Sequence, residues 1–394
     1  MKRREDSSHS DTSVRHTETD TTLLFMAFPP QKPRLLIPPA HPRVQAMAFG
    51  LYSPGSIKGK ILKYLGKSAA SLGLMKMAAP FIARPPSMLD VTDRVKPIFN
   101  GYLLEQLRNA WEQALNAGPI AFAISLGDPN YYQKVTALVF DQDSEPRAFA
   151  KIGCTNQSKC LIENERVALE ALKSHPGTRF ITPDLLGHGE TGNASWLLQS
   201  PLLDGRPSGM ALQKHHFAFL GEMAHLMKKP AVPDVSPLWS HMSKTVNTPV
   251  LPIKAGFEAE RPFIEALAKR FKSVDAGGSH KSWPISAAHG DFAPWNMRVI
   301  NGRIALFDWE YFMPEAPAGW DVFHYIARVA HLIHGKPLER IWEGSEDDAC
   351  RAALVSWADE TGLELPDFQT MKMLVLLSIA LDLVPRMICR RHRE

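Results

Sequence analysis

The residues best suited to chemistry lie close together in the chain, between positions 288 and 325. His289-Gly290-Asp291 is followed by Asn296 and then by Asp308-Trp309-Glu310. Two strand-like runs, NMRVI and RIALFD, flank Asn301-Gly302, which is a strong short signal for a β-hairpin. Such a hairpin returns Asn296 and Asp308 to the same end of one rigid unit. Their amide and carboxylate oxygens suit Mg²⁺, and Asp291 at the mouth of that site could accept a proton from a hydroxyl.

The order of these residues follows the protein-kinase catalytic loop, HxD-x4-N, with a metal-binding Asp after it. In the form HGD-x4-N with DWE in place of DFG, the chain resembles the aminoglycoside phosphotransferase and choline kinase family over residues 100–390. The resemblance implies a catalytic Asp291, Mg²⁺ bound by Asn296 and Asp308, and ATP as the phosphoryl donor. GTP stays open as the donor, because only Gly127 stands in SLGDPNYYQK and no GxGxxG motif is present.

The same resemblance identifies nucleotide-binding residues upstream of the catalytic segment. Lys151, in the strand-like run AFAKIG, matches the lysine that contacts ATP phosphates. Glu165 matches the glutamate that pairs with that lysine, and Glu163 remains the alternative. A carboxylate is needed there because it holds the long lysine side chain in one conformation. The hinge between the two lobes is expected at LLQSPLLDG, where the backbone from Gln199 to Leu202 would meet adenine.

The elements that must position these residues follow from periodicity. A helical pattern ends at Gly118-Pro119, and three strand-like runs joined by turn-forming residues predict an antiparallel meander. A helix near 158–173 and two more strands precede a mostly helical remainder. Strands followed by helices predict an α+β protein with two lobes, similar to protein kinases. We expect a sheet lobe over 96–203 that binds nucleotide and a helical lobe over 204–394 that holds the catalytic and acceptor sites. The predicted runs are 120–126, 132–140, 146–153, 179–186 and 194–200 for strands, and 209–228, 259–272, 319–334, 348–361 and 368–388 for the later helices.

Residues 1–95 differ in composition from the rest of the chain. The whole chain carries a net charge of +4, but no Asp or Glu occurs between Thr21 and Leu89, where nine Lys and Arg residues lie. Eleven of the 31 prolines also precede residue 98. We therefore predict a basic, proline-rich extension over residues 1–95, of which residues 1–22 are expected to be disordered.

Within this extension, residues 55–79 have the pattern of a cationic amphipathic helix. Ile57, Ile61, Leu65, Leu72 and Met75 share one side, and Lys60, Lys63 and Lys67 share another. Such a helix could make peripheral contact with an anionic membrane or could dock on the two lobes, and both remain open. Nucleic acid is not expected as a partner, because Tyr64 is the only aromatic residue in the segment.

Composition narrows the remaining classes of protein. With 45% hydrophobic and 22% charged residues, the chain is neither a disulfide miniprotein nor wholly disordered. Its four cysteines form no CxxC pair, so a thiolate zinc site is not expected. The N-terminus lacks an apolar signal region, and the most apolar run, 373–385, is too short to span a bilayer. We therefore expect a cytoplasmic enzyme, with membrane association open through residues 55–79.

These observations leave three functional hypotheses. The leading one is a kinase that transfers the γ-phosphoryl group of ATP to the hydroxyl of a small molecule such as an amino alcohol, a sugar or an aminoglycoside-like acceptor. A lipid head group or membrane-linked sugar is the corresponding acceptor if residues 55–79 bind a membrane. The second is a nucleotide-binding pseudokinase that acts as a scaffold. The third is a protein kinase, against which PEAPAGWD counts because it stands where an APE-like segment would follow.

Overall fold

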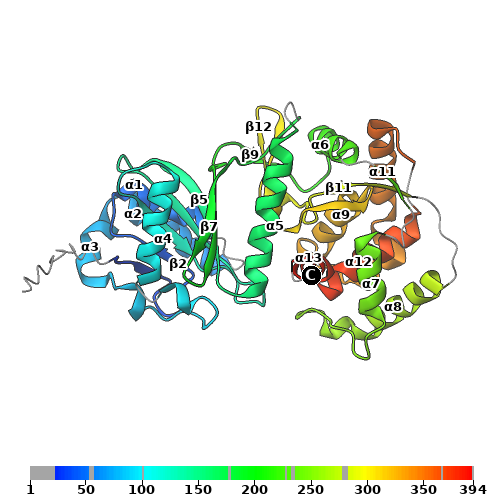
Figure 1. The fold of residues 1–394 in the computed structure, drawn as a ribbon, viewed down its shortest axis with the longest axis horizontal. Coiled ribbons are helices and arrows are strands. Elements are labelled where there is room, and N and C mark those ends of the chain that lie inside the picture. The colour runs from blue at the N-terminus through cyan, green and yellow to red at the C-terminus, as the bar shows by residue number, and fades with distance from the viewer. Residues whose placement is uncertain are drawn as a thin grey trace, which may run out of the picture.

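The computed structural model describes residues 23–52, 57–99, 102–175, 179–226, 229–231, 236–276, 283–364 and 367–392. The tail predicted to be disordered, residues 1–22, lies outside this range. Figure 1 shows a sheet lobe and a helical lobe, with the long helix α5 (Asn156–Lys173) between them. The α+β, two-lobed architecture predicted from the sequence is confirmed.

The sheet lobe is built on seven antiparallel strands in the order β1-β2-β3-β4-β5-β8-β7. The predicted meander forms its centre, because β3, β4 and β5 pair in sequence order. Their side chains alternate between two buried faces, as apolar strands that are covered on both sides must. The strands are β1 (Met26–Phe28), β2 (Leu35–Ile37), β3 (Ala121–Ser125), β4 (Val135–Phe140), β5 (Pro146–Gly153), β7 (Leu185–Thr191) and β8 (Ala194–Gln199).

The two faces of this sheet are covered by different parts of the chain. Helix α4 (Tyr102–Ala114) inserts Trp111 against Phe122 on one face, with ring centroids 5.3 Å apart. On the other face, Phe49 from the N-terminal segment packs in one cluster with Leu138 and Phe140. The described part of the predicted extension therefore contributes strands β1 and β2 to the sheet and helices to its cover.

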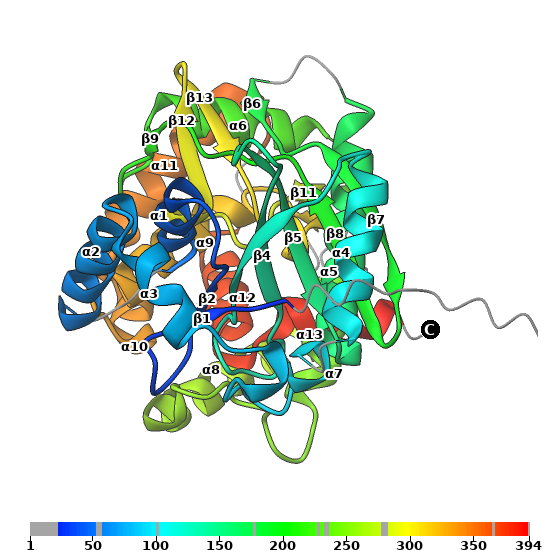
Figure 2. The ribbon, with the colours of Figure 1, turned by 90° about the vertical axis from the view of Figure 1, so that its left-hand side faces the viewer.

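Three helices of that N-terminal segment lie together at one side of the sheet lobe (Figure 2). They are α1 (Pro42–Ala48), α2 (Ile57–Ser71) and α3 (Leu74–Ile82). The single helix predicted over residues 55–79 is thus two helices, separated at Gly73, whose φ of +77° breaks the helical path. Residues 55 and 56 lie outside the described range.

The helical lobe follows from β9 (Arg206–Pro207) onward, and its helices pack in one large apolar cluster. The predicted helix over 368–388 is divided at Asp382, whose left-handed backbone (φ +52°) ends one helix and begins the next. Among the described residues the helices are α6 (Lys214–His225), α7 (Pro237–Val246), α8 (Arg261–Ala276), α9 (Trp320–Leu332), α10 (Leu338–Arg340), α11 (Asp347–Thr361), α12 (Phe368–Leu381) and α13 (Leu383–Arg391). None of the helices in the described residues is long and apolar enough to cross a membrane.

Two small sheets carry the catalytic segment. The four-stranded sheet has the order β6-β13-β12-β9 and the three-stranded sheet the order β10-β11-β14. The expected hairpin is β12 paired with β13, with both Asn301 (φ +50°) and Gly302 (φ +77°) in the left-handed region that its tight turn needs. The strands are β6 (Phe180–Ile181), β9 (Arg206–Pro207), β10 (Lys229–Ala231), β11 (Trp283–Ala288), β12 (Met297–Ile300), β13 (Arg303–Leu306) and β14 (Met313–Pro317).

Candidate active site

Lys151 and Glu165 form a buried ion pair between strand β5 and helix α5. Lys151 Nζ lies 2.6 Å from both carboxylate oxygens of Glu165, and the two side chains are almost fully buried. Thr155 caps α5 by accepting from the backbone N–H of Ser158, so the helix begins directly after β5. Glu163, the alternative partner, instead binds Arg166. Of the two glutamates, Glu165 is therefore the one paired with Lys151.

Asp308 joins this pair from the end of the hairpin and meets a second lysine. Its Oδ1 lies 2.6 Å from Lys151 Nζ and 3.3 Å from Lys134 Nζ, and Lys134 also pairs with Glu310. Burial acts to raise the pKa of Asp308, but Lys134 and Lys151 outweigh it and hold that pKa well below its usual range. Burial likewise acts to lower the pKa of Lys151, whereas Asp308 and Glu165 raise it above its ordinary value. Both groups therefore stay charged.

The loop that carries Asp291 is fixed by a buried carboxylate from α9. Asp321 accepts the backbone N–H groups of His289 at 2.8 Å and of Gly290 at 3.1 Å. His289 is buried, and burial lowers its pKa to about 4, so the ring is neutral near pH 7. Its Nε2 then donates to the carbonyl of Phe307 at 3.2 Å, and its Nδ1 accepts the backbone N–H of Asp291 at 3.3 Å. His289 thus ties the loop to the hairpin.

Asn296 and two residues of α9 surround the Asp291 carboxylate. Asn296 Nδ2 donates to both the carbonyl and the Oδ2 of Asp291, at 2.9 Å each. On the other side, His324 Nε2 lies 3.7 Å and Arg328 Nε 3.8 Å from Asp291 Oδ1. The Arg328 guanidinium also stacks over Trp295, 5.7 Å from the ring centroid. The carboxylate is held in one orientation, with a cation beside it.

A cavity of about 840 Å³ lies between the lobes, and Lys151 and Asp308 reach its wall. The expected hinge residues Gln199 and Leu202 line the same cavity, together with Leu138 and Phe149 of the sheet. The side-chain Oε1 of Gln199 is buried and has no hydrogen-bond partner among the described residues. A buried acceptor without a partner is costly, so it favours a ligand that donates a hydrogen bond there.

The N-terminal segment also forms part of this cavity. Arg43 and Met47 of α1 and Lys67 and Ser71 of α2 line it as well. The predicted extension is thus a wall of the cavity, and the cavity is incomplete without it.

The donor set near Asp308 suits a divalent cation. Carboxylate oxygens of Glu165, Asp308 and Glu310 lie within 4.8 Å of one another. Since the Nδ2 of Asn296 points to Asp291, its Oδ1 is the atom left to face a cation. Carboxylate and amide oxygens are the hard ligands that Mg²⁺ prefers, so these residues fit that ion.

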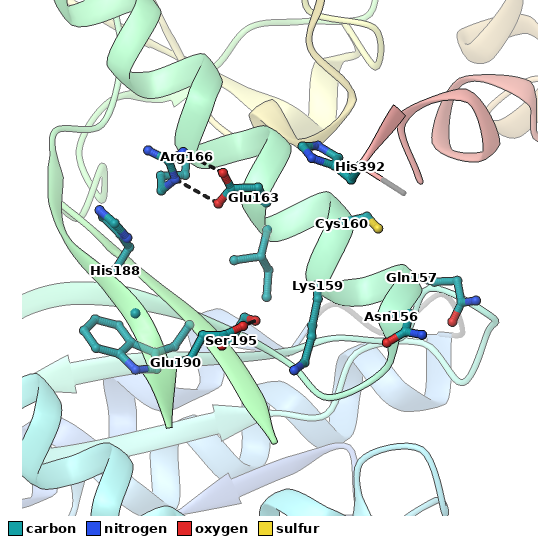
Figure 3. A pocket seen from close by; sticks show the side chains of 13 residues that line it. Asn156, Gln157, Lys159, Cys160, Glu163, Arg166, His188, Glu190, Ser195 and His392 are labelled. Carbon is teal, nitrogen blue, oxygen red and sulfur yellow. Dashed lines mark hydrogen bonds and ion pairs between the residues drawn. The ribbon is translucent and has the colours of Figure 1, made fainter. Parts of the chain in front are cut away.

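A second cavity, of about 560 Å³, is separate from this cluster (Figure 3). It lies between α5, β7 and β8, where His188 and Glu190 face Lys159 and the Glu163–Arg166 pair. None of Asp291, Asn296 and Asp308 lines it. Its wall holds no arrangement that matches the chemistry of the site between the lobes.

The sequence-predicted residues thus fall into two connected groups. Lys151, Gln199, Leu202 and Asp308 line the cavity, with Glu165 buried behind Lys151, whereas Asp291 and Asn296 lie around the loop that His289 ties to the hairpin.

Sequence reasoning missed four charged or titratable neighbours: Lys134, Glu310, His324 and Arg328. A signal existed for the last two, because positions 321, 324 and 328 share one face of α9. Lys134 had none, because its contact with Asp308 spans 174 positions of the chain.

No protein-family model and no curated protein matches the chain. Among solved structures, it is similar to the aminoglycoside phosphotransferase APH(3'')-Id from Streptomyces rimosus in complex with ADP and streptomycin, at 16% identity and a TM-score of 0.42, covering 70% of this chain and 97% of that one. It is also similar to the amicoumacin kinase hAmiN in complex with AMP-PNP, Ca²⁺ and Ami (14% identity, TM-score 0.39, 76% and 96% covered). A glucosamine kinase in complex with glucosamine, ADP and inorganic phosphate gives 14% identity and a TM-score of 0.32, with 70% and 94% covered. At these identities the likeness assigns no substrate to this chain.

Proposed function

We propose that this protein is a small-molecule kinase, which transfers the γ-phosphoryl group of ATP to a hydroxyl. The observation that carries the proposal is the joined ion-pair cluster of Lys151, Glu165 and Asp308 at the wall of a cavity large enough for a nucleotide. A buried lysine held by one carboxylate and facing a second is a costly arrangement for stability alone. Such an arrangement is explained if the lysine binds phosphate and the carboxylates bind a metal ion.

In this mechanism the protein acts mainly by positioning charges. Lys151, fixed by Glu165, neutralises phosphate charge, and Lys134 adds a second positive charge beside Asp308. Asp291 orients the acceptor hydroxyl and takes its proton as the oxygen attacks the γ-phosphorus. The bond from that phosphorus to the bridging oxygen then breaks, and ADP leaves with the electron pair.

Asp308 and Asn296 are the proposed Mg²⁺ ligands, with Glu310 close by. When bound, Mg²⁺ would offset the negative charge of the phosphates. Gln199 and Leu202 are proposed to contact the base, and the unpartnered Gln199 Oε1 suits the amino group of adenine better than the oxygen at the same place in guanine. This supports ATP over GTP as the donor.

The surroundings of Asp291 favour an acceptor that is neutral or negatively charged. Arg328 lies 3.8 Å from the Asp291 carboxylate and would repel a polycation at that point. Residues 339–348, beside the start of α11, are rich in Asp and Glu, but three of these carboxylates, from Glu343, Glu346 and Asp347, are each paired with a Lys or Arg and so are already neutralised. We therefore expect sugars or other neutral alcohols to be better acceptors than aminoglycosides.

The test is an ADP-release screen of the purified full chain with Mg·ATP against neutral sugars, sugar phosphates, amino alcohols and aminoglycosides. With the best acceptor, Asp291→Asn should lower turnover by about 10²- to 10⁴-fold while nucleotide binding is kept. Asp308→Ala should weaken nucleotide binding in calorimetry only when Mg²⁺ is present. Asp143→Asn, at an exposed turn residue of the sheet lobe away from the cavity, serves as the control. Wild-type turnover in Asp291→Asn would overturn the assignment of the base.

A further inference from the structure

Helix α2 is oriented with its small residues inward and its bulky apolar residues outward. A Cβ atom added to Gly66 would lie 2.5 Å from the ring of Phe49, so any other residue there would require the buried Phe49 ring to shift. Ala70, one turn later, is fully buried on the same side. The inner face of α2 is therefore set by small side chains, and its large apolar side chains must face away from the protein.

Large apolar residues are exposed along α2, α3 and the turn between them, and together they define one candidate area. Ile57 is 77% exposed, Leu65 59% and Phe81 77%. We call the area the α2–α3 surface, and it consists of the exposed apolar residues Ile57, Ile61, Leu62, Tyr64, Leu65, Leu72, Leu74, Met77, Phe81 and Ile82. Scattered exposed apolar residues are ordinary, but ten within 26 positions mark an interaction surface.

The charge around this surface has one sign. Lys58, Lys60, Lys76 and Arg84 are all exposed on or beside the two helices, whereas Lys67 lines the cavity between the lobes. Lys63 is different, because its ammonium group donates to the carbonyl of Tyr52 and so faces inward. With no acidic residue between Thr21 and Leu89, nothing in the sequence of this segment offsets the positive charges.

We propose that the α2–α3 surface binds the interface of an anionic lipid bilayer, with both helices lying in the plane of the membrane. Apolar side chains would enter the boundary between head groups and acyl chains, while the flanking lysines contact anionic head groups. A second copy of this chain fits less well as the occupant, because two such surfaces would bring their positive charges together. Nucleic acid would leave the apolar side chains uncovered.

Full-length protein is needed for the test, because β1, β2 and α1 of the same segment are part of the sheet lobe. Co-sedimentation is measured with vesicles of phosphatidylcholine alone and with vesicles containing about 30% phosphatidylserine, at low and at high salt. Wild type should bind the anionic vesicles, lose much of this binding at high salt and bind neutral vesicles weakly.

Two sets of variants then separate the apolar and the basic contribution. The triple variant Ile61→Ser, Leu65→Ser, Phe81→Ser should lower the partition coefficient about tenfold or more, because it removes three inserted side chains. The variant Lys58→Gln, Lys60→Gln, Lys76→Gln should weaken binding to anionic vesicles only. Each variant has a matched control made of exposed residues on the helical lobe. The control for the serine variant is the triple variant Val250→Ser, Leu332→Ser, Val355→Ser. The control for the glutamine variant is the triple variant Lys214→Gln, Lys269→Gln, Lys272→Gln.

Equal sedimentation of wild type and the apolar variant would overturn the proposal, as would no sedimentation of either. Gel filtration of the same proteins distinguishes the rival occupant. A concentration-dependent dimer that the serine variant abolishes, without vesicle binding, would assign the surface to a second copy of the chain. Thermal melts of each variant show whether a loss of binding merely reflects unfolding.

Discussion

At the scale of single residues, the cluster around Asp308 has an unequal charge balance. Three carboxylates, from Glu165, Asp308 and Glu310, face two ammonium groups, from Lys134 and Lys151. The sum of −1 in a buried place is unfavourable unless a cation is added, since charges are costly to bury without partners. The lysines therefore hold the carboxylates ready for a divalent ion.

Gln199 gives a prediction that distinguishes ligand binding from packing. Gln199→Met keeps the length of the side chain and removes the unpartnered buried Oε1. The free energy of unfolding should rise by about 1 kcal/mol, because an unsatisfied polar atom is lost, while ATP affinity falls by roughly tenfold, because a hydrogen bond to adenine is lost. Thermal melts and calorimetry check the two changes. A variant that is both less stable and weaker in binding would instead indicate a general packing defect.

At the scale of the elements, the hairpin and the loop before β12 act as one unit. The predicted β12–β13 pair has the register that brings Asn296 beside Phe307, whose N–H donates to the Asn296 carbonyl at 3.1 Å. Short-range signals such as Asn301-Gly302 are sufficient to predict this unit from the sequence, because the turn and both strands are adjacent in the chain. The backbone N–H groups of His289 and Gly290 donate to Asp321, 32 positions after His289, and these hydrogen bonds fix the loop from outside the hairpin.

Other elements could not be read from local signals. The strands β1 and β2 have only three residues each, and they join the sheet because β2 pairs with β3, about 90 positions later in the chain, as in the pairing of Leu35 with Ser125. Their formation depends on tertiary contacts, which outweigh propensity in such short segments. In the same way, the contact of Lys134 with Asp308 depends on how the lobes meet, and no local pattern reports it.

Gly290, the glycine of the HGD segment, should not tolerate substitution, because its backbone conformation and its close neighbours leave no room for a Cβ atom. Gly290 has a φ of +83°, and a Cβ there would overlap the carbonyl oxygen of Tyr311. Gly290→Ala should therefore lower stability by about 1–3 kcal/mol or more and displace Asp291, with a large loss of turnover. Gly302→Ala is the matched control, because its φ of +77° is similar and no atom lies within 4 Å of the added Cβ. Equal effects of the two substitutions in melts and in turnover would contradict this explanation.

At the scale of the whole molecule, buried histidines should make stability depend on pH. Burial lowers the pKa of His216 to about 3 and those of His241, His289 and His324 to about 4. Below pH 6.5 the unfolded chain takes up protons that the folded chain does not, so the free energy of unfolding should fall as the pH falls from about 6.5 to about 4. Asp321 has the opposite effect on stability. Burial raises its pKa to about 7, so between about pH 4 and pH 7 its carboxyl group is protonated more in the folded chain than in the unfolded chain.

The slope should reach about 1.4 kcal/mol per pH unit for each histidine that Asp321 does not offset. Denaturant titrations between pH 4.5 and 7 measure it. His216 lies outside the cluster around Asp291. The substitution His216→Gln should reduce the slope by the contribution of one histidine, about 1.4 kcal/mol per pH unit. The exposed His175→Gln is the control, and an unchanged slope in His216→Gln would rule out this residue as a source.

Helix α2 faces the cavity between the lobes with Lys67 and Ser71 and faces the outside with Ile61 and Leu65. A thermodynamic cycle therefore joins the two surfaces of this one helix. By whatever factor a ligand on the outer face changes the affinity of the cavity for its own ligand, occupation of the cavity must change the outer affinity by the same factor. If vesicles bind the outer face as proposed, any effect that they have on nucleotide affinity must be matched by an equal effect of nucleotide on vesicle affinity, so titrating one ligand measures the other.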